Sequence, residues 1–398
     1  MILAQMGWGR GDLIDTGLAQ GTLHGAVLGP RDADPSEIVA CARKWNGSLK
    51  GKGLTFLDPQ FYVTTIPSPK DGKLSEYPYY APALTRASFG PKEASDYAKR
   101  VLEFQSTLDV TRWTSPTVLV SGFRDPWSQI ALSLAQASIA EYGQRESKVR
   151  KPLLASFVVD ELALRDRPAL DEYLDSLTAL EADGFYLIVR RNDPIYPANY
   201  EEDALVNLMY MTYVLGAVNS YEVVHGYTDI VGLLLLAVGA KAVATGWYSN
   251  LRQFSLTRFE DRKKGGHPPR ERYTSRILLN SILVNPELAQ IFAAGKLGQV
   301  LSKTSYDGAL GKNPAGVEWP RRTSCLHHWE VLGEIALSVT KLKKVKDRLD
   351  LLESLANQAQ TAYTELRAAT ISFDPANGPR DSALWLRAIK RFREEAGL

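Results

Sequence analysis

The sequence has few of the features that usually identify a protein class. It contains only two cysteines, Cys41 and Cys325, in 398 residues, and two distant thiols in a long chain argue against structural disulfides. Lys and Arg number 47 against 45 Asp and Glu, so the net charge indicates no class of partner. The longest apolar run, around 233–236, is too short to span a bilayer. No basic segment precedes the first apolar residues, so we predict no signal peptide, no membrane association and a cytoplasmic location.

Several catalytic and cofactor motifs are also absent. There is no GxSxG nucleophile elbow, no P-loop and no GxGxxG dinucleotide fingerprint. Cys325, His327 and His328 stand close together, but no second group of ligands at zinc-like spacing accompanies them. We therefore expect a helix start there, with one histidine capping and one buried, and we predict neither a bound metal nor a cofactor.

The clearest structural pattern lies in residues 221–252. A β-prone segment ends at residue 226, residues 230–238 are almost wholly apolar, and 242–245 is a second short apolar segment. This order predicts a parallel strand–helix–strand unit. A helix that is apolar on nearly all faces must be buried, so we expect it to pack on a sheet and beneath further chain.

Short apolar segments alternate with helical segments through residue 255. The expected strands are 2–6, 24–28, 54–56, 117–120, 153–159, 185–189, 222–224 and 242–245. This alternation predicts an α/β fold, a (β/α)8 TIM-like barrel over residues 1–255, although an open doubly wound sheet would show the same pattern. Residues 256–398 are predicted to form a helical C-terminal region that begins with a basic linker. Its expected helices are 273–292, 327–368 and 383–395, with a break near 341–348.

In such a barrel the functional side chains lie at the carboxyl ends of the strands. Asp160 and Glu161 directly follow the fifth expected strand. An inward aspartate against apolar walls would have a raised pKa and could act as a general acid or base. A structural salt bridge to Arg124 or Arg190 on a neighbouring strand is an equally good interpretation.

Glycines follow the last two expected strands, at Gly226 beside His225 and at Gly246. Many barrels hold a phosphate at this place, where glycine lets an anion approach the backbone. This pattern suggests an alternative function, a barrel enzyme that acts on a small phosphorylated substrate with Asp160 or Glu161 as its base.

Three segments resemble the tRNA-guanine transglycosylase superfamily. Residues 54–61, LTFLDPQF, are similar to the family's strand that presents an Asp near a Phe and a Gln at the base-binding pocket. Residues 236–240, LAVGA, resemble the end of its buried helix, and 247–252, WYSNLR, resemble the aromatic and basic run that follows. No aspartate stands at the family's nucleophile position, which falls at 244–246, and the family's cysteine-rich zinc motif is absent.

The resemblance implies a barrel that binds or modifies a base in nucleic acid, either DNA or tRNA. Asp58 would be the base-proximal carboxylate, and Asp160 or Asp229 would substitute for the missing nucleophile. Because an enzyme that works on a base must unstack it, further side chains should surround the base. The expected substrate-binding residues are Gln60, Glu161, His225, Gly226, Trp247, Tyr248 and Arg252.

The same resemblance leaves a second possibility, in which the barrel has lost its chemistry. It would then serve as a catalytically degenerate subunit of a nucleic-acid-related assembly. The C-terminal helices would form its interface with a protein partner or with a second copy of the chain.

A basic segment follows the last expected strand. Between 258 and 276 it carries seven lysines and arginines opposed by only three carboxylates, and paired glycines and prolines interrupt it. Because it leaves the barrel on the face of the presumed site, we expect a mobile loop that holds phosphates. The expected nucleic-acid contacts are Arg258, Arg262, Lys263, Lys264, Arg270 and Arg272.

Overall fold

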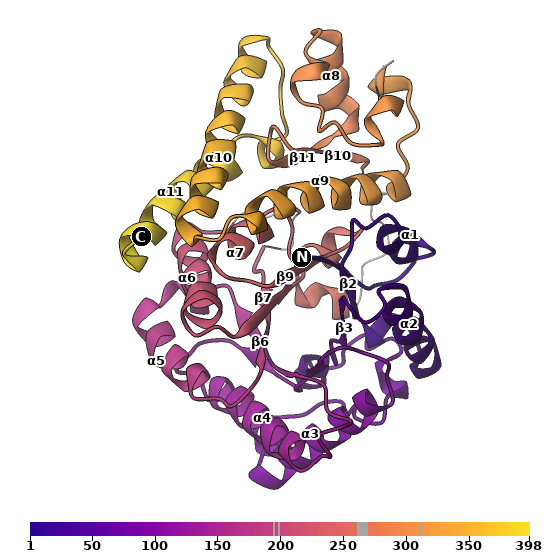
Figure 1. Cartoon of the computed structure of the whole chain (residues 1–398), viewed down its shortest axis with the longest axis vertical. Helices are drawn as coiled ribbons and strands as arrows, with labels where there is room; N and C mark the ends of the chain where they lie inside the picture. The colour runs from indigo at the N-terminus through magenta and orange to yellow at the C-terminus, as the bar shows by residue number, and fades with distance from the viewer. Residues whose placement is uncertain (194–195, 198–199, 261–269, 311–312) are drawn as a thin grey trace.

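The computed structural model describes residues 1–193, 196–197, 200–260, 270–310 and 313–398. Its main sheet has the hydrogen-bonded order β3-β2-β1-β9-β8-β7-β6-β4, with β5 also on β6, and every pair is parallel. The predicted (β/α)8 barrel is confirmed as a nearly closed ring of strands surrounded by helices (Figure 1). The strands are β1 (Ile2–Gln5), β2 (Gly25–Leu28), β3 (Leu54–Leu57), β4 (Trp113–Thr114), β5 (Leu119–Val120), β6 (Leu153–Asp160), β7 (Gly184–Arg190), β8 (Glu222–Gly226) and β9 (Ala242–Thr245).

The fourth barrel strand differs from the single segment expected at 117–120. It consists of two short pieces, β4 and β5, that both pair with β6. Pro116 lies between them and has no N–H to donate to a ladder, which explains the interruption. Across the remaining gap to β3, the backbone N–H of Thr111 donates to the carbonyl of Thr55 at 2.8 Å, and the hydroxyl of Thr114 donates to the carbonyl of Leu57 at 2.6 Å.

Helices follow the strands as the sequence predicted. Three of them begin at an aspartate whose carboxylate accepts a first-turn backbone N–H, Asp34 at 2.9 Å, Asp125 at 2.8 Å and Asp166 at 3.1 Å. A proline in the first turn of each adds to this start, because its missing N–H would have had no partner there. The first six are α1 (Leu13–Ala19), α2 (Pro35–Ser48), α3 (Pro91–Ser106), α4 (Pro126–Gly143), α5 (Arg167–Thr178) and α6 (Glu202–Thr212), which a π-helix (Tyr213–Val218) extends.

The apolar helix α7 (Gly232–Val238) is the most deeply packed helix of the ring. All of its residues are buried, and it joins the parallel strands β8 and β9 as predicted. No side chain caps its first turn, and the hydroxyl of Thr228, shortly before it, donates to the carbonyl of Ala244 at 3.2 Å. Its outer side is covered by α9 (Arg321–Lys341) and α10 (Val345–Ala368), which confirms that further chain lies over it.

The eighth helix of the ring comes from the C-terminal region. α9 packs against α1, α7 and β1, and so fills the place between the last and the first barrel helices (Figure 1). Leu326, Trp329 and Leu332 of α9 belong to the same hydrophobic core as the barrel strands. The boundary expected at residue 255 therefore does not separate two cores. Residues 246–320 are an insertion between the eighth strand and its helix.

The last two helices form a second layer outside α6 and α7. The expected long helices with a break near 341–348 are confirmed as α9 and α10, and α11 (Arg380–Ala396) completes the chain. α11 packs along α6, where Arg387 pairs with Glu202 and Arg391 pairs with Asp203. The inner faces of α10 and α11 are thus buried against α6 and α7 of the same chain. Within the described ranges, no helix has the length and apolarity needed to cross a bilayer.

Residues 273–292 do not form the predicted helix. β10 (Arg272–Ser275) and β11 (Asn280–Leu283) make an antiparallel hairpin, followed by a π-helix (Val284–Leu288) and α8 (Ala289–Ala293). The hydroxyls of Thr274 and Ser281 lie 2.9 Å apart across the hairpin. Its Tyr273 packs in a second, smaller core with Trp319 and with Tyr363 of α10. These contacts between distant segments override the helical spacing of the local sequence.

Candidate functional site

The carboxyl ends of the strands form a mouth that has a closed side and an open side. The closed side centres on Asp58, which follows β3 and is 2% exposed. Its carboxylate accepts the backbone N–H of Gln60 at 3.0 Å and the hydroxyls of Tyr62 at 3.0 Å and Tyr227 at 3.3 Å. Burial raises the pKa of Asp58 from 3.8 to about 6 despite these donors. The expected base-proximal carboxylate is therefore a buried acid that titrates near neutrality.

We call the group of buried residues around Asp58 the closed chamber. Two of them have a left-handed backbone conformation, which residues other than glycine rarely adopt. Gln60 has φ of 52° and Tyr227 has φ of 53°, both in the left-handed region. Their side chains meet, since Nε2 of Gln60 donates to the hydroxyl of Tyr227 at 3.1 Å, and Oε1 of Gln60 accepts the backbone N–H of Arg31 at 2.9 Å. Such strained positions cluster at functional sites, where the surrounding structure must enforce them.

Below Asp58, several polar side chains point into the barrel. The rings of Phe56 and Tyr186 meet across it at 5.0 Å, and Ser156 is in register with Tyr186, so it faces the same way. The hydroxyls of Tyr186 and Ser156 and both amide atoms of Gln5 have no hydrogen-bond partner in the described part of the chain. The barrel interior is thus more polar than packing alone requires.

The closed chamber is covered in part by Arg258, which the sequence assigned to a mobile loop. Arg258 lies in a short 3-10 helix (Leu256–Phe259), is 5% exposed and forms an ion pair with Asp32. Its guanidinium also donates to the hydroxyl of Tyr227 at 3.3 Å. Phe254 packs on Tyr227 with ring centroids 5.0 Å apart. Arg258 therefore seals the chamber, and its charge is satisfied inside the protein.

Asp160 and Glu161 take the salt-bridge role that the sequence left open. Asp160 forms an ion pair with Arg190 and accepts the side-chain N–H of Asn192 at 3.0 Å. Glu161 binds the buried guanidinium of Arg191 at 3.0 Å. Asp160 does lie at the mouth and faces inward, in register with Arg190. Because cations already occupy both carboxylates, neither one is exposed to a ligand in this structure.

The glycines after the last two strands serve close packing. A Cβ on Gly226 would lie 2.3 Å from the hydroxyl of Tyr186, and one on Gly246 would lie 2.5 Å from Cβ of Leu251. His225 faces away from the mouth and lies 2.9 Å from the hydroxyl of Thr212 in α6. Burial lowers its pKa to about 3, so it is neutral. Both glycines therefore have a packing role that does not depend on a bound anion, and the phosphate of the alternative function stays a prediction.

The open side of the mouth begins with a small pocket after β8, between the barrel and α11. It has a volume of about 60 Å³ and is lined by Asp229, Tyr196, Arg252 and Asp381, among others. Asp229 accepts hydrogen bonds from the hydroxyl of Tyr196 and, at 2.9 Å, from the backbone N–H of Ile230. Arg252 donates to the same hydroxyl at 3.1 Å. We call this space the acidic pocket.

Asp381 was not identified from the sequence. It lies in the first turn of α11, and burial raises its pKa from 3.8 to about 7, with the charge of Asp229 adding to the shift. Its Oδ1 has no hydrogen-bond partner in the described chain. Only tertiary packing brings residue 381 to the end of a strand that finishes at residue 226, so no local pattern could have indicated it.

An arginine groove adjoins the acidic pocket and shares Tyr196 and Arg252 with it. The groove has a volume of about 640 Å³, within the range of small-ligand sites. The side chain of Arg321 lies over the ring of Tyr248 at 4.6 Å and also donates to its hydroxyl. The guanidinium of Arg272 lies 5.5 Å from the ring of Tyr196. The complete lining is Tyr196, Trp247, Tyr248, Ser249, Arg252, Arg270, Glu271, Arg272, Arg321, Ser324 and Asp374.

The groove gathers five residues that the sequence singled out: Trp247, Tyr248, Arg252, Arg270 and Arg272. Arg270 is exposed, Tyr248 is half-buried and Trp247 is largely buried. Arg272 already uses part of its hydrogen-bonding capacity within the protein, because it donates to the carbonyl of Ser281 at 2.6 Å and to Asn377 at 2.7 Å. The expected contacts Arg262, Lys263 and Lys264 lie outside the described residues.

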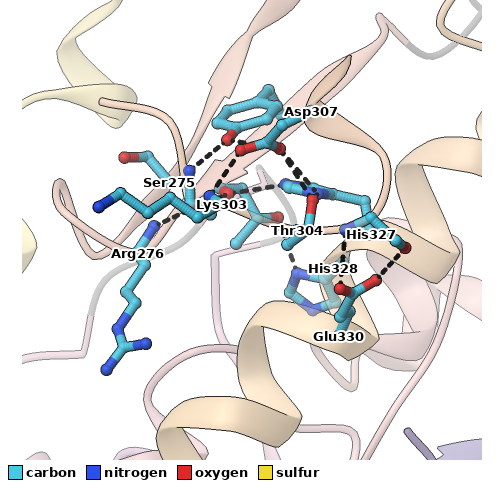
Figure 2. A network of polar contacts seen from close by, with 12 residues as sticks. Ser275, Arg276, Lys303, Thr304, Asp307, His327, His328 and Glu330 are labelled. Carbon is cyan, nitrogen blue, oxygen red and sulfur yellow. Dashed lines mark hydrogen bonds and ion pairs between the residues drawn. The ribbon is translucent and has the colours of Figure 1, made fainter. Parts of the chain in front are cut away.

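The hairpin wall of the groove is attached to α9 by a buried polar network (Figure 2). Nδ1 of His327 lies 2.9 Å from the hydroxyl of Thr304, which donates to Asp307 at 2.8 Å, and Nε2 lies 2.8 Å from the carbonyl of Thr274. Nδ1 of His328 lies 2.9 Å from the hydroxyl of Thr274. Burial lowers the pKa of both histidines. Neither caps the helix start as expected, and together they hold the hairpin in place.

The described residues around these histidines are not arranged as a metal centre. Cys325 is buried, and burial raises the pKa of its thiol to about 12, so it is a protonated core residue. Among the described positions, no three His, Cys, Asp or Glu side chains converge in a way that could hold a metal ion.

Comparison with known proteins adds no identity. No protein-family model matches the chain, and no curated protein sequence matches it. Function must therefore be inferred from the chemistry of the barrel mouth.

Proposed function

We propose that the open side of the barrel mouth binds nucleic acid, with phosphates in the arginine groove and a base beside the acidic pocket. The observation that carries this proposal is the composition of the groove, in which four arginines and three aromatic rings outnumber two carboxylates. Phosphates bind to arginine, and bases stack on aromatic rings and on guanidinium planes. A groove that offers both at one place fits a nucleotide unit.

The acidic pocket supplies the groups for chemistry on such a base. Asp229 is oriented by Tyr196 and by a backbone N–H, and the neutral ring of His328 lies behind it, with Nε2 3.4 Å from Oδ1. A fixed carboxylate in this position can accept a base N–H or attack a sugar carbon. Asp381, with a pKa of about 7, can donate or accept a proton near neutral pH.

This arrangement fits the resemblance to the tRNA-guanine transglycosylase superfamily, with Asp229 in place of the missing nucleophile. Asp58, the base-proximal carboxylate by that resemblance, lies in the closed chamber. It would reach a base only after the ion pair of Arg258 with Asp32 had opened. The proposal therefore assigns first contact to the open side and treats Asp58 as a group that acts after an opening step.

A small phosphorylated substrate is the second candidate, and the limited size of the groove favours it. The two candidates differ in how binding depends on salt, because a polynucleotide releases several counterions and a single phosphate releases few.

The first test measures the affinity of labelled single-stranded oligonucleotides and of tRNA over a range of salt concentrations. We expect Arg270→Glu combined with Arg321→Glu to weaken binding at least about tenfold at low salt. The slope of log affinity against log salt should fall by roughly 0.7 for each lost single-strand contact. Both arginines are exposed at the groove, so their replacement should leave the fold intact.

Lys92→Glu combined with Lys99→Glu is the matched control. Both lysines are exposed on α3, at the end of the molecule opposite α9 (Figure 1). The control makes the same change in net charge and should keep the wild-type slope. If both double variants lose affinity equally, binding is a general charge effect and the groove is not the site. A wild type that binds phosphorylated small molecules but no polynucleotide would support the second candidate.

The chemistry needs its own test, with mass spectrometry of bound nucleic acid to detect release or exchange of a base. Asp229→Asn should abolish any such reaction while binding stays within about twofold, since the groove arginines are unchanged. An Asp229→Asn protein that turns over normally would exclude Asp229 as the reacting carboxylate.

A further inference from the structure

Trp8 differs from every other tryptophan of the chain. It is one of eight and is 68% exposed, whereas the others, all at described positions, are buried or half-buried. An isolated exposed apolar residue is common on protein surfaces. Trp8 differs from such isolated residues because its loop contacts residues that line the arginine groove.

The loop after β1 places Trp8 at the rim of the groove. The carbonyl of Trp8 accepts the indole N–H of Trp247 at 3.0 Å. A Cβ built on Gly9 would lie 3.5 Å from the hydroxyl of Tyr248. Trp247 and Tyr248 both line the groove, so the backbone of residues 8 and 9 forms part of its edge.

The residues on either side of Trp8 hold this loop in place. A Cβ on Gly7 would lie 2.8 Å from the methyl groups of Leu251, so the backbone at Gly7 is pressed against the segment that carries the aromatic run. Gly9 has φ of +66°, a left-handed conformation that glycine adopts without strain. The loop is therefore anchored on both sides of a side chain that remains in solvent.

We infer that Trp8 is a stacking platform for an unpaired base of a nucleic acid whose phosphates lie in the groove. This inference rests on the proposed function. An indole presents a large flat face to any base, which gives affinity with little dependence on sequence. Arg270 and Arg321 line the groove, are exposed, and would hold the phosphates of the same strand. This excess of positive charge favours nucleic acid over a protein surface as the occupant.

The bound segment must then contain at least one base that is not paired. A fully paired duplex offers its faces only at its ends, so the platform selects single strands, loops or bases already turned out of a helix. This preference deepens the proposed function, because it names the kind of nucleic acid that the mouth would receive.

The test compares Trp8→Ala and Trp8→Phe with wild type on two oligonucleotides of equal charge. One carries ordinary bases, and the other carries consecutive abasic sites. We expect Trp8→Ala to bind the ordinary strand about tenfold more weakly, whereas Trp8→Phe should keep most of the affinity. The salt slope should stay at the wild-type value in both variants, because neither change removes a cation. Both variants should bind the abasic strand as wild type does.

A fluorescence titration gives an independent measurement. The difference in emission between wild type and Trp8→Phe reports Trp8, and the ordinary strand should quench it while the abasic strand should not. If wild type binds no oligonucleotide, the proposed function fails and this inference fails with it. If oligonucleotides bind normally to Trp8→Ala, only the inference fails. If Trp8→Ala instead converts a dimer into a monomer in sedimentation, the rim is a subunit contact, and that result also overturns the inference.

Discussion

The two sides of the barrel mouth use similar residues in different ways. On the closed side, Asp32 pairs with Arg258 and Asp160 pairs with Arg190, so each carboxylate has a cation of the same chain as its partner. On the open side, Arg252 and Asp229 line spaces that solvent can enter. Charged residues at strand ends therefore stabilise the fold where they form ion pairs with one another. Where a pocket lies between them, they can contact a ligand.

This difference explains why residue type alone is a weak guide to a site. A carboxylate at a strand end is equally prominent in the sequence whether its partner is an arginine of the same chain or a ligand. On the closed side, an arginine of the same chain pairs with each of these carboxylates. The open side exists because the insertion 246–320 and α11 surround the end of β8 without filling it.

The largest expected effect comes from breaking the buried ion pair of the closed side. Asp32→Ala removes the carboxylate that pairs with Arg258, whose side chain is 3% exposed. A buried charge without its partner costs about 3–5 kcal/mol, and we expect the free energy of unfolding in urea to fall by that amount.

Glu172→Ala is the control for this change. It removes the partner of Arg124 from a pair whose side chains are 64% and 55% exposed, so the free energy of unfolding should hardly change. Equal losses in the two variants would contradict the distinction between a closed and a solvated side.

The next prediction uses the pH dependence of stability. The pKa of Asp58 in the folded state is about 6, above its ordinary 3.8, so the folded state holds the proton more tightly than the unfolded state. Its ionisation therefore lowers stability as pH rises from about 4 to about 6, by roughly 3 kcal/mol at most, and has no further effect above that range. Asp58→Asn should abolish this decline, which denaturant unfolding at stepped pH would show.

Asp381→Asn applies the same measurement, the pH dependence of unfolding, to the open side. The pKa of Asp381 is about 7, also raised by burial, so its contribution to the decline should continue to about pH 7. The curves of wild-type minus variant stability against pH should therefore level off about one pH unit apart for the two variants.

If Asp58→Asn leaves the pH profile unchanged, the carboxyl group of Asp58 is hydrated and the chamber is not closed.

The smallest expected effect separates two aspartates that the sequence could not rank. Asp160→Asn weakens the pairing with Arg190 and should cost about 1–3 kcal/mol of unfolding free energy. Asp229→Asn should cost about 1 kcal/mol or less, because its carboxylate is 20% exposed at the pocket and lies near the like charge of Asp381. Urea midpoints in the reverse order would show that Asp229 is the structural carboxylate and Asp160 the available one.

Much of the architecture was determined by the sequence itself. The alternation of short apolar strands with helical segments predicted the barrel, because strand and helix periods are local properties. The apolar run of α7 predicted burial under further chain for the same reason. The resemblance of residues 247–252 to the aromatic and basic run of the tRNA-guanine transglycosylase superfamily implied that they lie at the site, and Trp247, Tyr248 and Arg252 line the groove after β9.

Only the tertiary structure decided which of those residues face a ligand. Arg258 was read as a loop cation, but folding brings it within reach of Asp32, far away in sequence, and the pair closes the chamber. Residues 273–292 have helical spacing, yet the chain forms a hairpin at 272–283, where α9 supplies buried partners for the hydroxyl and the carbonyl of Thr274. Asp381 reaches the mouth through the packing of α11 on α6. A local pattern specifies the shape of each element, whereas pairing across the chain depends on which elements become neighbours.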